Sequence, residues 1–337
     1  MSLLEFETMN PPSFHGTPIG GMEIFSRVKA LPIPLPTTIA GALGSYLGIR
    51  LKLTSRDPCE NLVKLYETLN SRLSCHNGVC IKGPLIYFEV GGARLSYPYV
   101  CIEDYFVPIT KAFRVCGNLS VCVDVDEESI VWRYSFRVGV ALERRNVLGE
   151  KKAMPGYFYK YAVSLYRYGS KVAKPIFAYL VPPATKVDGI VRFGGKGSIV
   201  RVLSRDLTYP SEVASRVISP IEGLDEGYYV TLSPVPLIPS SPYPTKLEEH
   251  FEAPLDLRSS EVLGVPRRCR ETGVLPPKLR VVRLGLGFSE AAGMRRPQIL
   301  ALPPGTVIRV RRRHERSPSP LMRALLGLGF SALYKLL

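Results

Sequence analysis

The stretch that decides the expected architecture is Val131-Trp132-Arg133-Tyr134-Ser135-Phe136-Arg137-Val138-Gly139-Val140-Ala141-Leu142, in which polar and apolar residues partly alternate. Alternation with a period of two is typical of a β-strand. A charged turn follows, and it holds Arg144, Arg145, Lys151 and Lys152. Residues 156–168 then return as a second strand rich in aromatic and basic side chains. The pattern predicts a long β-hairpin with a basic tip.

The sequence upstream of this hairpin predicts a strand, two helices and two further strands. Residues 3–8 are expected to form a strand, and the prolines at 32, 34 and 36 hold the following segment extended. Thr37 or Thr38 can cap a helix that begins at Ile39. The glycines at 41, 44 and 48 weaken this helix, so we expect another backbone to pack closely against it. A second helix is expected over 61–73, and strands over 85–90 and 119–124.

Downstream of the hairpin the chain is dominated by strands. They are expected over 176–180, 189–193, 198–203, 228–232, 279–286 and 298–310, with short helices over 212–218 and 321–326. Residues 240–277 are rich in proline and charge and are expected to be a surface insertion. Sheets with few helices, in the order strand–helix–strand, favour an α+β fold built from ferredoxin-like units.

Composition points to a polyanionic partner. The chain of 337 residues carries 44 Lys and Arg against 29 Asp and Glu, a formal charge of +15. An excess of this size fits nucleic acid better than an acidic small substrate. The alternative is a basic surface that only keeps the protein soluble. The start has no basic leader, and no apolar run is long enough to span a membrane, so a cytoplasmic protein is expected.

The sharpest local motif is Arg192-Phe193-Gly194-Gly195-Lys196-Gly197-Ser198, between two expected strands. Three glycines allow backbone amides to approach an anion, and Arg192 and Lys196 add positive charge. The motif is not a nucleotide-triphosphate loop, because Ile190 stands where a glycine is needed and Gly197 where Ser or Thr is needed. The motif predicts contact with an RNA backbone, and the alternative is a purely structural turn.

Other candidate residues are weaker. Arg295 and Arg296 follow a glycine-rich turn at 285–287 and can also meet phosphates, and Arg27 is a further possible RNA contact. His15 is a possible RNA contact too, and as a general base it would support a second hypothesis, metal-independent RNA cleavage. The four histidines are scattered, and no hydrolase or metalloprotease motif is present. We therefore expect no catalytic residue, no metal and no cofactor.

The sequence does not determine whether the seven cysteines are reduced, disulfide-bonded or bound to a metal. Cys75 and Cys80 flank His76, and Cys59 lies upstream, but a zinc site usually needs two close ligand pairs. A disulfide is a better interpretation than zinc, and reduced loop cysteines are better still.

Four stretches, in this order, resemble one known family. Residues 30–43 resemble the proline-led, helix-opening segment of CRISPR RAMP proteins. Residues 136–144, followed by 156–159, look like the Arg-x-Gly-x-x-Leu to Gly-x-x-Tyr hairpin of the family of third subunits of Cmr effector complexes, which belong to type III-B CRISPR systems. Residues 193–197 and 296–307 are similar to that family's Leu-Gly-Gly-Glu and Pro-Pro-Gly-Ser-Val stretches. Lys196 stands where the family has glutamate, and the first loop carries His15 where the family commonly has arginine.

The resemblance implies a fold and a role. The fold would be two ferredoxin-like (RRM-like) units with antiparallel sheets, over 1–130 and 171–337, and a protruding β-hairpin thumb over 131–170. The chain would be a non-catalytic, RNA-binding subunit of an antiviral ribonucleoprotein. Its partners would be the 5′ tag of the CRISPR RNA, the large polymerase-like subunit and the backbone RAMP subunits. The alternatives are an endoribonuclease that processes CRISPR repeat RNA and a scaffold that binds only protein.

Overall fold

The computed structural model describes residues 2–15, 30–51, 57–116, 120–144, 151–183, 185–194, 198–205, 211–239, 251–252, 260–269, 276–289, 293–311 and 318–336. Its centre is a sheet of ten strands in the order β11-β12-β1-β10-β9-β8-β5-β4-β2-β3. A further pairing between β10 and β2 joins two strands that are far apart in this order. The sheet therefore contains a closed antiparallel barrel of six strands, β2, β10, β9, β8, β5 and β4.

The barrel strands all come from one stretch of the chain, residues 82–181. They are β2 (Lys82–Val90), β4 (Tyr99–Ile102), β5 (Tyr105–Pro108), β8 (Ile130–Arg144), β9 (Lys151–Tyr168) and β10 (Lys171–Val181). Two strands pair with the same edge of β10: its first three residues pair with β9, and its later residues pair with β1. β1 (Ser2–Thr8), β12 (Ile199–Arg205) and β11 (Asp188–Arg192) continue the sheet from there, and β3 (Ala93–Arg94) borders β2.

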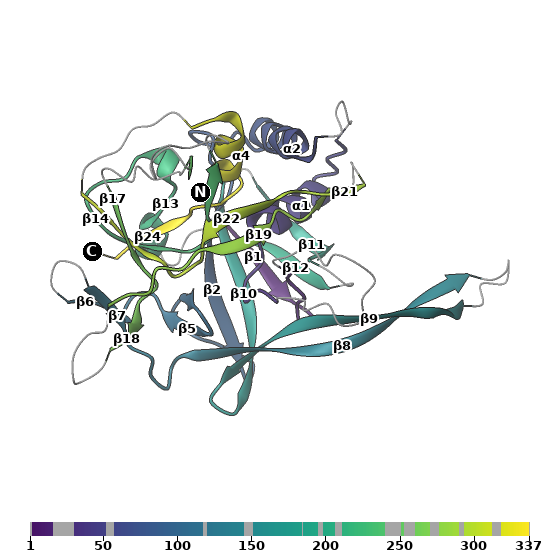
Figure 1. Cartoon of the computed structure of the whole chain (residues 1–337), viewed down its shortest axis with the longest axis horizontal. Helices are drawn as coiled ribbons and strands as arrows, with labels where there is room; N and C mark the ends of the chain where they lie inside the picture. Colours follow the sequence, from purple (N-terminus) through teal and green to yellow (C-terminus); the bar gives the residue numbers. More distant parts are fainter. Residues whose placement is uncertain are drawn as a thin grey trace.

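The expected hairpin is confirmed. β8 and β9 pair from Val131 opposite Arg167 to Arg144 opposite Lys151, with one irregularity between Val140 and Leu142. The roots of both strands belong to the barrel, and their outer parts extend from the body as a two-stranded arm (Figure 1). The division of the chain at residues 130 and 170 stays a prediction.

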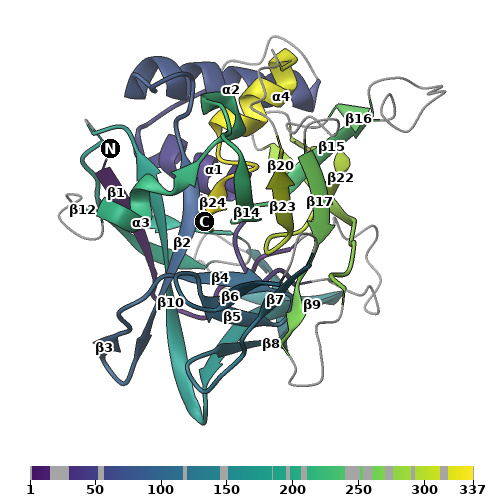
Figure 2. The same ribbon diagram turned by 90° about the vertical axis from the view of Figure 1, so that its left-hand side faces the viewer.

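The ten-stranded sheet has a hydrophobic core on each face. Successive residues of β10 alternate between them: Phe177 and Tyr179 join the core that holds the helices, whereas Ala178 and Leu180 join the other. The first core contains side chains of α1 (Pro36–Tyr46), α2 (Pro58–Leu73) and α4 (Pro320–Gly327). α2 and α4 lie side by side in both views (Figures 1 and 2).

The second core is covered by smaller sheets from the C-terminal part. The largest has the order β13-β24-β14-β23-β17, and a four-stranded sheet has the order β16-β15-β22-β19. The remaining elements are β6 (Phe113–Cys116), β7 (Ser120–Val123), α3 (Ser211–Ser215), β13 (Val217–Ile218), η1 (Pro220–Glu222), β14 (Gly227–Thr231), β15 (Val235–Pro239), β16 (Phe251–Glu252), β17 (Ser260–Gly264), β18 (Arg267–Arg268), β19 (Val282–Gly285), β20 (Phe288–Ser289), β21 (Met294–Arg295), β22 (Gln298–Leu302), β23 (Val307–Val310) and β24 (Leu333–Lys335).

The expected α+β fold of two ferredoxin-like (RRM-like) units is wrong. The chain is mostly β, with 49% strand and 17% helix, and it contains the closed barrel. The strand–helix–strand order is real for β1, α1, α2 and β2, but the strands that follow close a ring, with β10 paired back to β2. The expected insertion at 240–277 is also corrected in part, because β17 pairs with β23 inside the five-stranded sheet.

Helix α1 departs from its expected start. Pro36 occupies the first turn and the N-cap is Leu35, which makes no side-chain capping bond, so neither threonine caps the helix. A proline at this position already has helical φ and needs no amide partner. The expected close backbone at the glycines is also wrong, because a Cβ on Gly41 would meet nothing within 4 Å. Gly48 lies beyond the helix and has φ +65°.

Two disulfides are present, and neither was expected as the leading state of the cysteines. Cys75 bonds to Cys80 within one turn, and Cys122 on β7 bonds to Cys269, 147 residues away. Cys59 is not disulfide-bonded. Among the described helices, none is long and apolar enough to cross a membrane.

Candidate nucleic-acid interface

A row of three aromatic rings lies along the root of β8, and its two outer rings are exposed. Trp132, Tyr134 and Phe136 alternate along the strand, so they share one face. Their ring centroids are 5.7 Å apart from Trp132 to Tyr134 and 5.4 Å apart from Tyr134 to Phe136. Trp132 is only 8% exposed, whereas Tyr134 and Phe136 are 49% and 43% exposed. We call these three residues the aromatic ladder.

The ladder is open because only the β9 half of this face is covered. The residues opposite the ladder are Tyr166, Ser164 and Ala162, and all three are buried. The Tyr166 hydroxyl donates to the carbonyl of Pro32 at 2.7 Å, and the Ser164 hydroxyl donates to that of Leu31 at 3.0 Å. Residues 31 and 32 thus lie over β9, and Tyr134 and Phe136 of β8 stay exposed.

Arginines occupy the other face of the same strand. Arg133 and Arg137 alternate with the ladder and are exposed. One Arg133 guanidinium nitrogen donates to the carbonyl of Trp132 at 2.9 Å, which holds this charge beside the ladder. Arg137 lies opposite Tyr161, and within the described ranges it has no ion-pair partner. β5 pairs with β8 only at Ile130 and Val131, so beyond them one edge of β8 has no neighbouring strand in the described structure. A single strand of nucleic acid along that edge can place its bases on the rings and its phosphates beside the arginines.

The outer residues of the hairpin are placed only by their backbone. Of the predicted basic residues, Arg144 pairs with Lys151 near the end of the described hairpin, whereas Lys152 pairs with Glu143. Arg145 lies outside the described residues. Tyr159, one of the aromatic residues of the expected return strand, pairs with Gly139.

The glycine motif has an internal explanation at its first glycine. Gly194 has φ +81°, and a Cβ built on it would lie 2.9 Å from the carbonyl oxygen of Ser13. The backbone that approaches Gly194 is therefore the chain's own N-terminal segment. Phe193 is fully buried and stacks on Phe6 at 5.2 Å, while Arg192 is exposed. Gly195, Lys196 and Gly197 lie outside the described residues.

The two C-terminal arginines differ. Arg295 is exposed on β21. Arg296 is half-buried, and burial lowers the pKa of its guanidinium. One guanidinium nitrogen of Arg296 donates to the carbonyl of Phe288 at 3.0 Å. Arg296 therefore holds the β20–β21 hairpin together, and its charge points inward.

His15 is brought to the base of the hairpin. The Ser13 hydroxyl donates to the carbonyl of Ala162 on β9 at 2.8 Å, and the same hydroxyl lies 3.4 Å from Nε2 of His15. His15 also forms a single β-bridge with Ala30. Arg27 lies outside the described residues.

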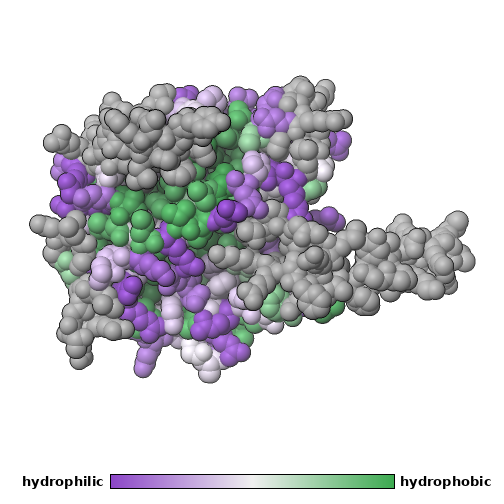
Figure 3. Space-filling view, viewed as in Figure 1, coloured by the Kyte–Doolittle hydropathy of each residue, from purple (hydrophilic) through white to green (hydrophobic). Residues whose placement is uncertain are grey.

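An apolar cleft opens at the foot of the ladder. It has a volume of about 270 Å³ and lies between the ladder, the segment 30–35 and strand β19. The face that carries β19 and β22 also shows apolar side chains gathered at its centre (Figures 1 and 3). Sequence reasoning missed both the cleft and the ladder. The Trp-x-Tyr-x-Phe alternation signals a row of rings, but a strand pattern does not say which face stays exposed.

Metal chemistry has no support in the described part of the chain, where no group of three or more His, Cys, Asp or Glu side chains could hold an ion.

No family model matches the sequence, and no curated protein matches it either. Solved structures do match the fold. A chain in the cryo-EM structure of the Type III-B Cmr-beta bound to cognate target RNA is similar with a TM-score of 0.56 and 16% identity, covering 99% of this chain and 96% of that one. A chain in the Cmr-beta structure with cognate target RNA and AMPPnP, state 1, is similar with a TM-score of 0.51 and 17% identity, covering 92% and 86%. At such identities the likeness shows a shared fold.

Proposed function

We propose that this chain is a non-catalytic, RNA-binding subunit of a type III-B, Cmr-type CRISPR effector complex. It holds the 5′ tag of the CRISPR RNA together with the large polymerase-like subunit. The fold similarity to chains of Cmr-beta complexes supports the type of assembly. The ordered sequence resemblance supports the third subunit and the tag.

The observation that carries RNA binding is the aromatic ladder beside exposed arginines. Adjacent exposed aromatic rings are rare on a surface that has no partner, because exposing each ring to water costs free energy. Every base has a flat face that can stack on such rings, whatever the RNA sequence. The formal charge of +15 attracts the phosphates of an RNA strand. This attraction brings the strand to the ladder.

The hairpin supports a long contact with the strand. β8 spans 15 residues and β9 spans 18, and the basic residues predicted from the sequence follow both strands outward. The rise of about 3.3 Å per residue makes β8 about 50 Å long. Such a length accommodates several nucleotides, and the ladder occupies only its root.

The experiment is to isolate the chain with an affinity tag from its native host and sequence the RNA that remains bound. We expect short RNAs that share one 5′ sequence and differ downstream, because each CRISPR RNA carries the same tag and its own spacer. A tagged Tyr134→Ala, Phe136→Ala double variant serves as the matched control and is expected to retain less RNA. Absence of RNA, or a random set of fragments, contradicts the proposal.

A further inference from the structure

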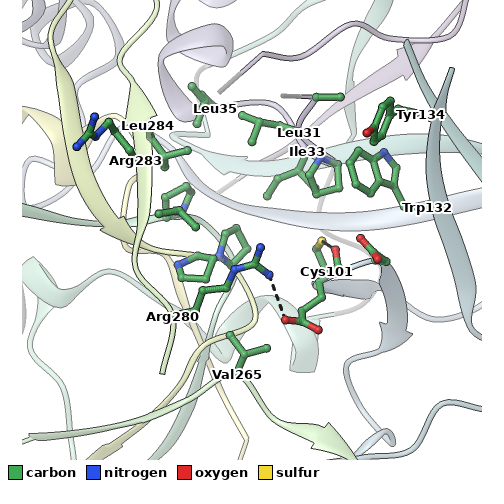
Figure 4. A pocket seen from close by; sticks show the side chains of 18 residues that line it. Leu31, Ile33, Leu35, Cys101, Trp132, Tyr134, Val265, Arg280, Arg283 and Leu284 are labelled. Carbon is green, nitrogen blue, oxygen red and sulfur yellow. Dashed lines mark hydrogen bonds and ion pairs between the residues drawn. The ribbon is translucent and has the colours of Figure 1, made fainter. Parts of the chain in front are cut away.

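The apolar cleft has two opposed walls. One wall carries the Trp132 and Tyr134 side chains of the ladder, and the other carries Val282 and Leu284 of β19. Figure 4 shows Leu31, Ile33 and Leu35 between these walls on one side and Arg280 on the other. Val282, Leu284 and Ala301 lie on one face of the β19–β22 pair, and Leu35 packs against that face. The two opposed walls therefore stand on strands β8 and β19, and the segment 30–35 with the turns at 103–104 and 303–304 closes the cleft between them.

The charges at the cleft are balanced. Arg280 donates to Glu103 across 3.1 Å, and Asp104 and Arg283 add one charge of each sign. The rest of the molecule carries a large positive excess, so this neutrality is local. A phosphate gains no net electrostatic attraction in this cleft. An uncharged ring that carries both hydrogen-bond donors and acceptors can bind these carboxylates and guanidinium groups.

Size and position narrow the occupant further. A volume of about 270 Å³ lies just below the range of pockets that hold drug-sized ligands, about 300–1,000 Å³, so one small planar group fits and a helix does not. The cleft also continues the ladder, because Trp132 and Tyr134 belong to both. The Trp132 indole nitrogen is buried without a hydrogen-bond partner in the described structure. An unpaired buried donor is destabilising, so a ligand acceptor that reaches this nitrogen is favoured.

We infer that the cleft binds one unstacked nucleobase of a single-stranded RNA, while the neighbouring bases stack on Tyr134 and Phe136. The inference rests on the proposed function and adds a base-binding subsite to it. The phosphates of the same strand stay outside, beside Arg133 and Arg137. A base is favoured over a partner protein's side chain because the aromatic wall runs on into the ladder.

Trp132 is the reporter for this subsite, because it is the single tryptophan of the chain. The full-length protein is titrated with a short oligouridine or oligoadenosine RNA, and separately with uridine and adenosine as free nucleosides. We expect both kinds of ligand to change the Trp132 emission. The nucleoside effect should be insensitive to salt, because a nucleoside has no phosphate.

Val282→Phe fills the cleft, and Val281→Phe is its matched control. Val281 is 49% exposed and does not line the cleft. It precedes Val282 directly, so the two side chains point to opposite faces of the extended chain. We expect Val282→Phe to abolish the nucleoside effect and to weaken RNA binding at least about fivefold, with the salt slope unchanged. Val281→Phe should behave as wild type. If Val282→Phe lowers the melting temperature, Arg283→Ala at the exposed rim of the cleft is used in its place. Arg283→Ala should weaken nucleoside binding.

Each remaining outcome decides the question. Equal nucleoside binding by Val282→Phe and Val281→Phe overturns the subsite, as does RNA binding without any change in Trp132 emission. A response to an apolar, proline-rich peptide but not to nucleosides also overturns it, in favour of a protein partner. A nucleoside response without RNA binding supports the cleft and contradicts the proposed function, so the two failures are distinguishable.

Discussion

Tyr134 and Phe136 carry the account at the scale of single residues. About half of each ring is exposed, so neither contributes much to the core. Tyr134→Ala should weaken binding of single-stranded RNA by about 1–3 kcal/mol, or about 5- to 150-fold, because one base loses its stacking partner. Fluorescence anisotropy with a labelled RNA measures the affinity, and differential scanning calorimetry should show a nearly unchanged melting temperature.

Tyr97→Ala is the control for this prediction. Tyr97 is 41% exposed and precedes β4, at the end of the β4–β5 pair that lies away from β8. Its loss should leave RNA affinity within the error of the assay. Equal losses from Tyr97→Ala and Tyr134→Ala would mean that the ladder has no special role.

Gly194 makes a structural prediction. Alanine at φ +81° is strained, and its Cβ would lie 2.9 Å from the Ser13 carbonyl oxygen. Gly194→Ala should lower the free energy of unfolding by about 2–4 kcal/mol in urea denaturation, from the left-handed backbone and the clash together. Gly91 has φ +61° with open space around it, so Gly91→Ala should lose only about 1–2 kcal/mol. Equal losses in the two variants would show that the approach of Ser13 is unimportant.

These residues also show what the sequence could and could not reveal. The surplus of glycines at 194–197 correctly indicates a close backbone at Gly194, but the pattern cannot tell an RNA from the chain's own residue 13. Arg296 looks like a surface charge in the sequence, yet its guanidinium donates to backbone carbonyls. Side-chain direction depends on which segments meet in space, and local patterns do not contain that information.

At the scale of elements, period-two alternation was a reliable guide. It predicted the hairpin, and β8 and β9 lie where the alternation places them. The helix expected over 61–73 is α2, and the one over 321–326 is α4. The expected strand over 298–310 is two strands, because the turn at 303–305 divides it into β22 and β23. Local propensity is sufficient for such elements because neighbouring residues determine it.

The arginine face of β8 gives the second prediction about RNA. Arg137→Ala should reduce the slope of log affinity against log salt by about 0.7, the value for one phosphate of a single strand. Arg201→Ala is the control, because Arg201 is exposed on β12 but lies 3.6 Å from Asp188. Anisotropy titrations over a range of salt concentrations measure both slopes. An unchanged slope for Arg137→Ala would place the phosphates elsewhere.

The disulfide between Cys122 of β7 and Cys269, the residue after β18, gives a prediction about stability. It closes a span of 147 residues, so its removal should release much conformational entropy in the unfolded chain. Cys269→Ser should lower the free energy of unfolding by about 2–5 kcal/mol under oxidising conditions. Cys75→Ser opens a span of only five residues and should lose less. Similar losses in urea denaturation for the two variants would contradict this prediction.

At the scale of the whole molecule, the closed barrel could not be predicted from the sequence. Its closure depends on β10 pairing with β2, whose facing residues Phe177 and Ile86 are 91 positions apart. Each strand reads as an ordinary strand, and nothing local marks a strand that must pair with two neighbours on one side and one on the other. Helices pack on one face of this sheet and the small sheets on the other.

The central claim is that a single strand of RNA lies along β8, with its bases on the aromatic ladder and its phosphates beside the arginines. The most direct test is an anisotropy titration of labelled single-stranded RNA against the wild-type protein and the Tyr134→Ala, Phe136→Ala double variant, repeated from low to high salt. The account predicts that log Kd rises linearly with log salt, by about 0.7 for each phosphate bound. It also predicts that the double variant gives a parallel line at weaker affinity. Affinity that is independent of salt, or two lines that coincide, would contradict it.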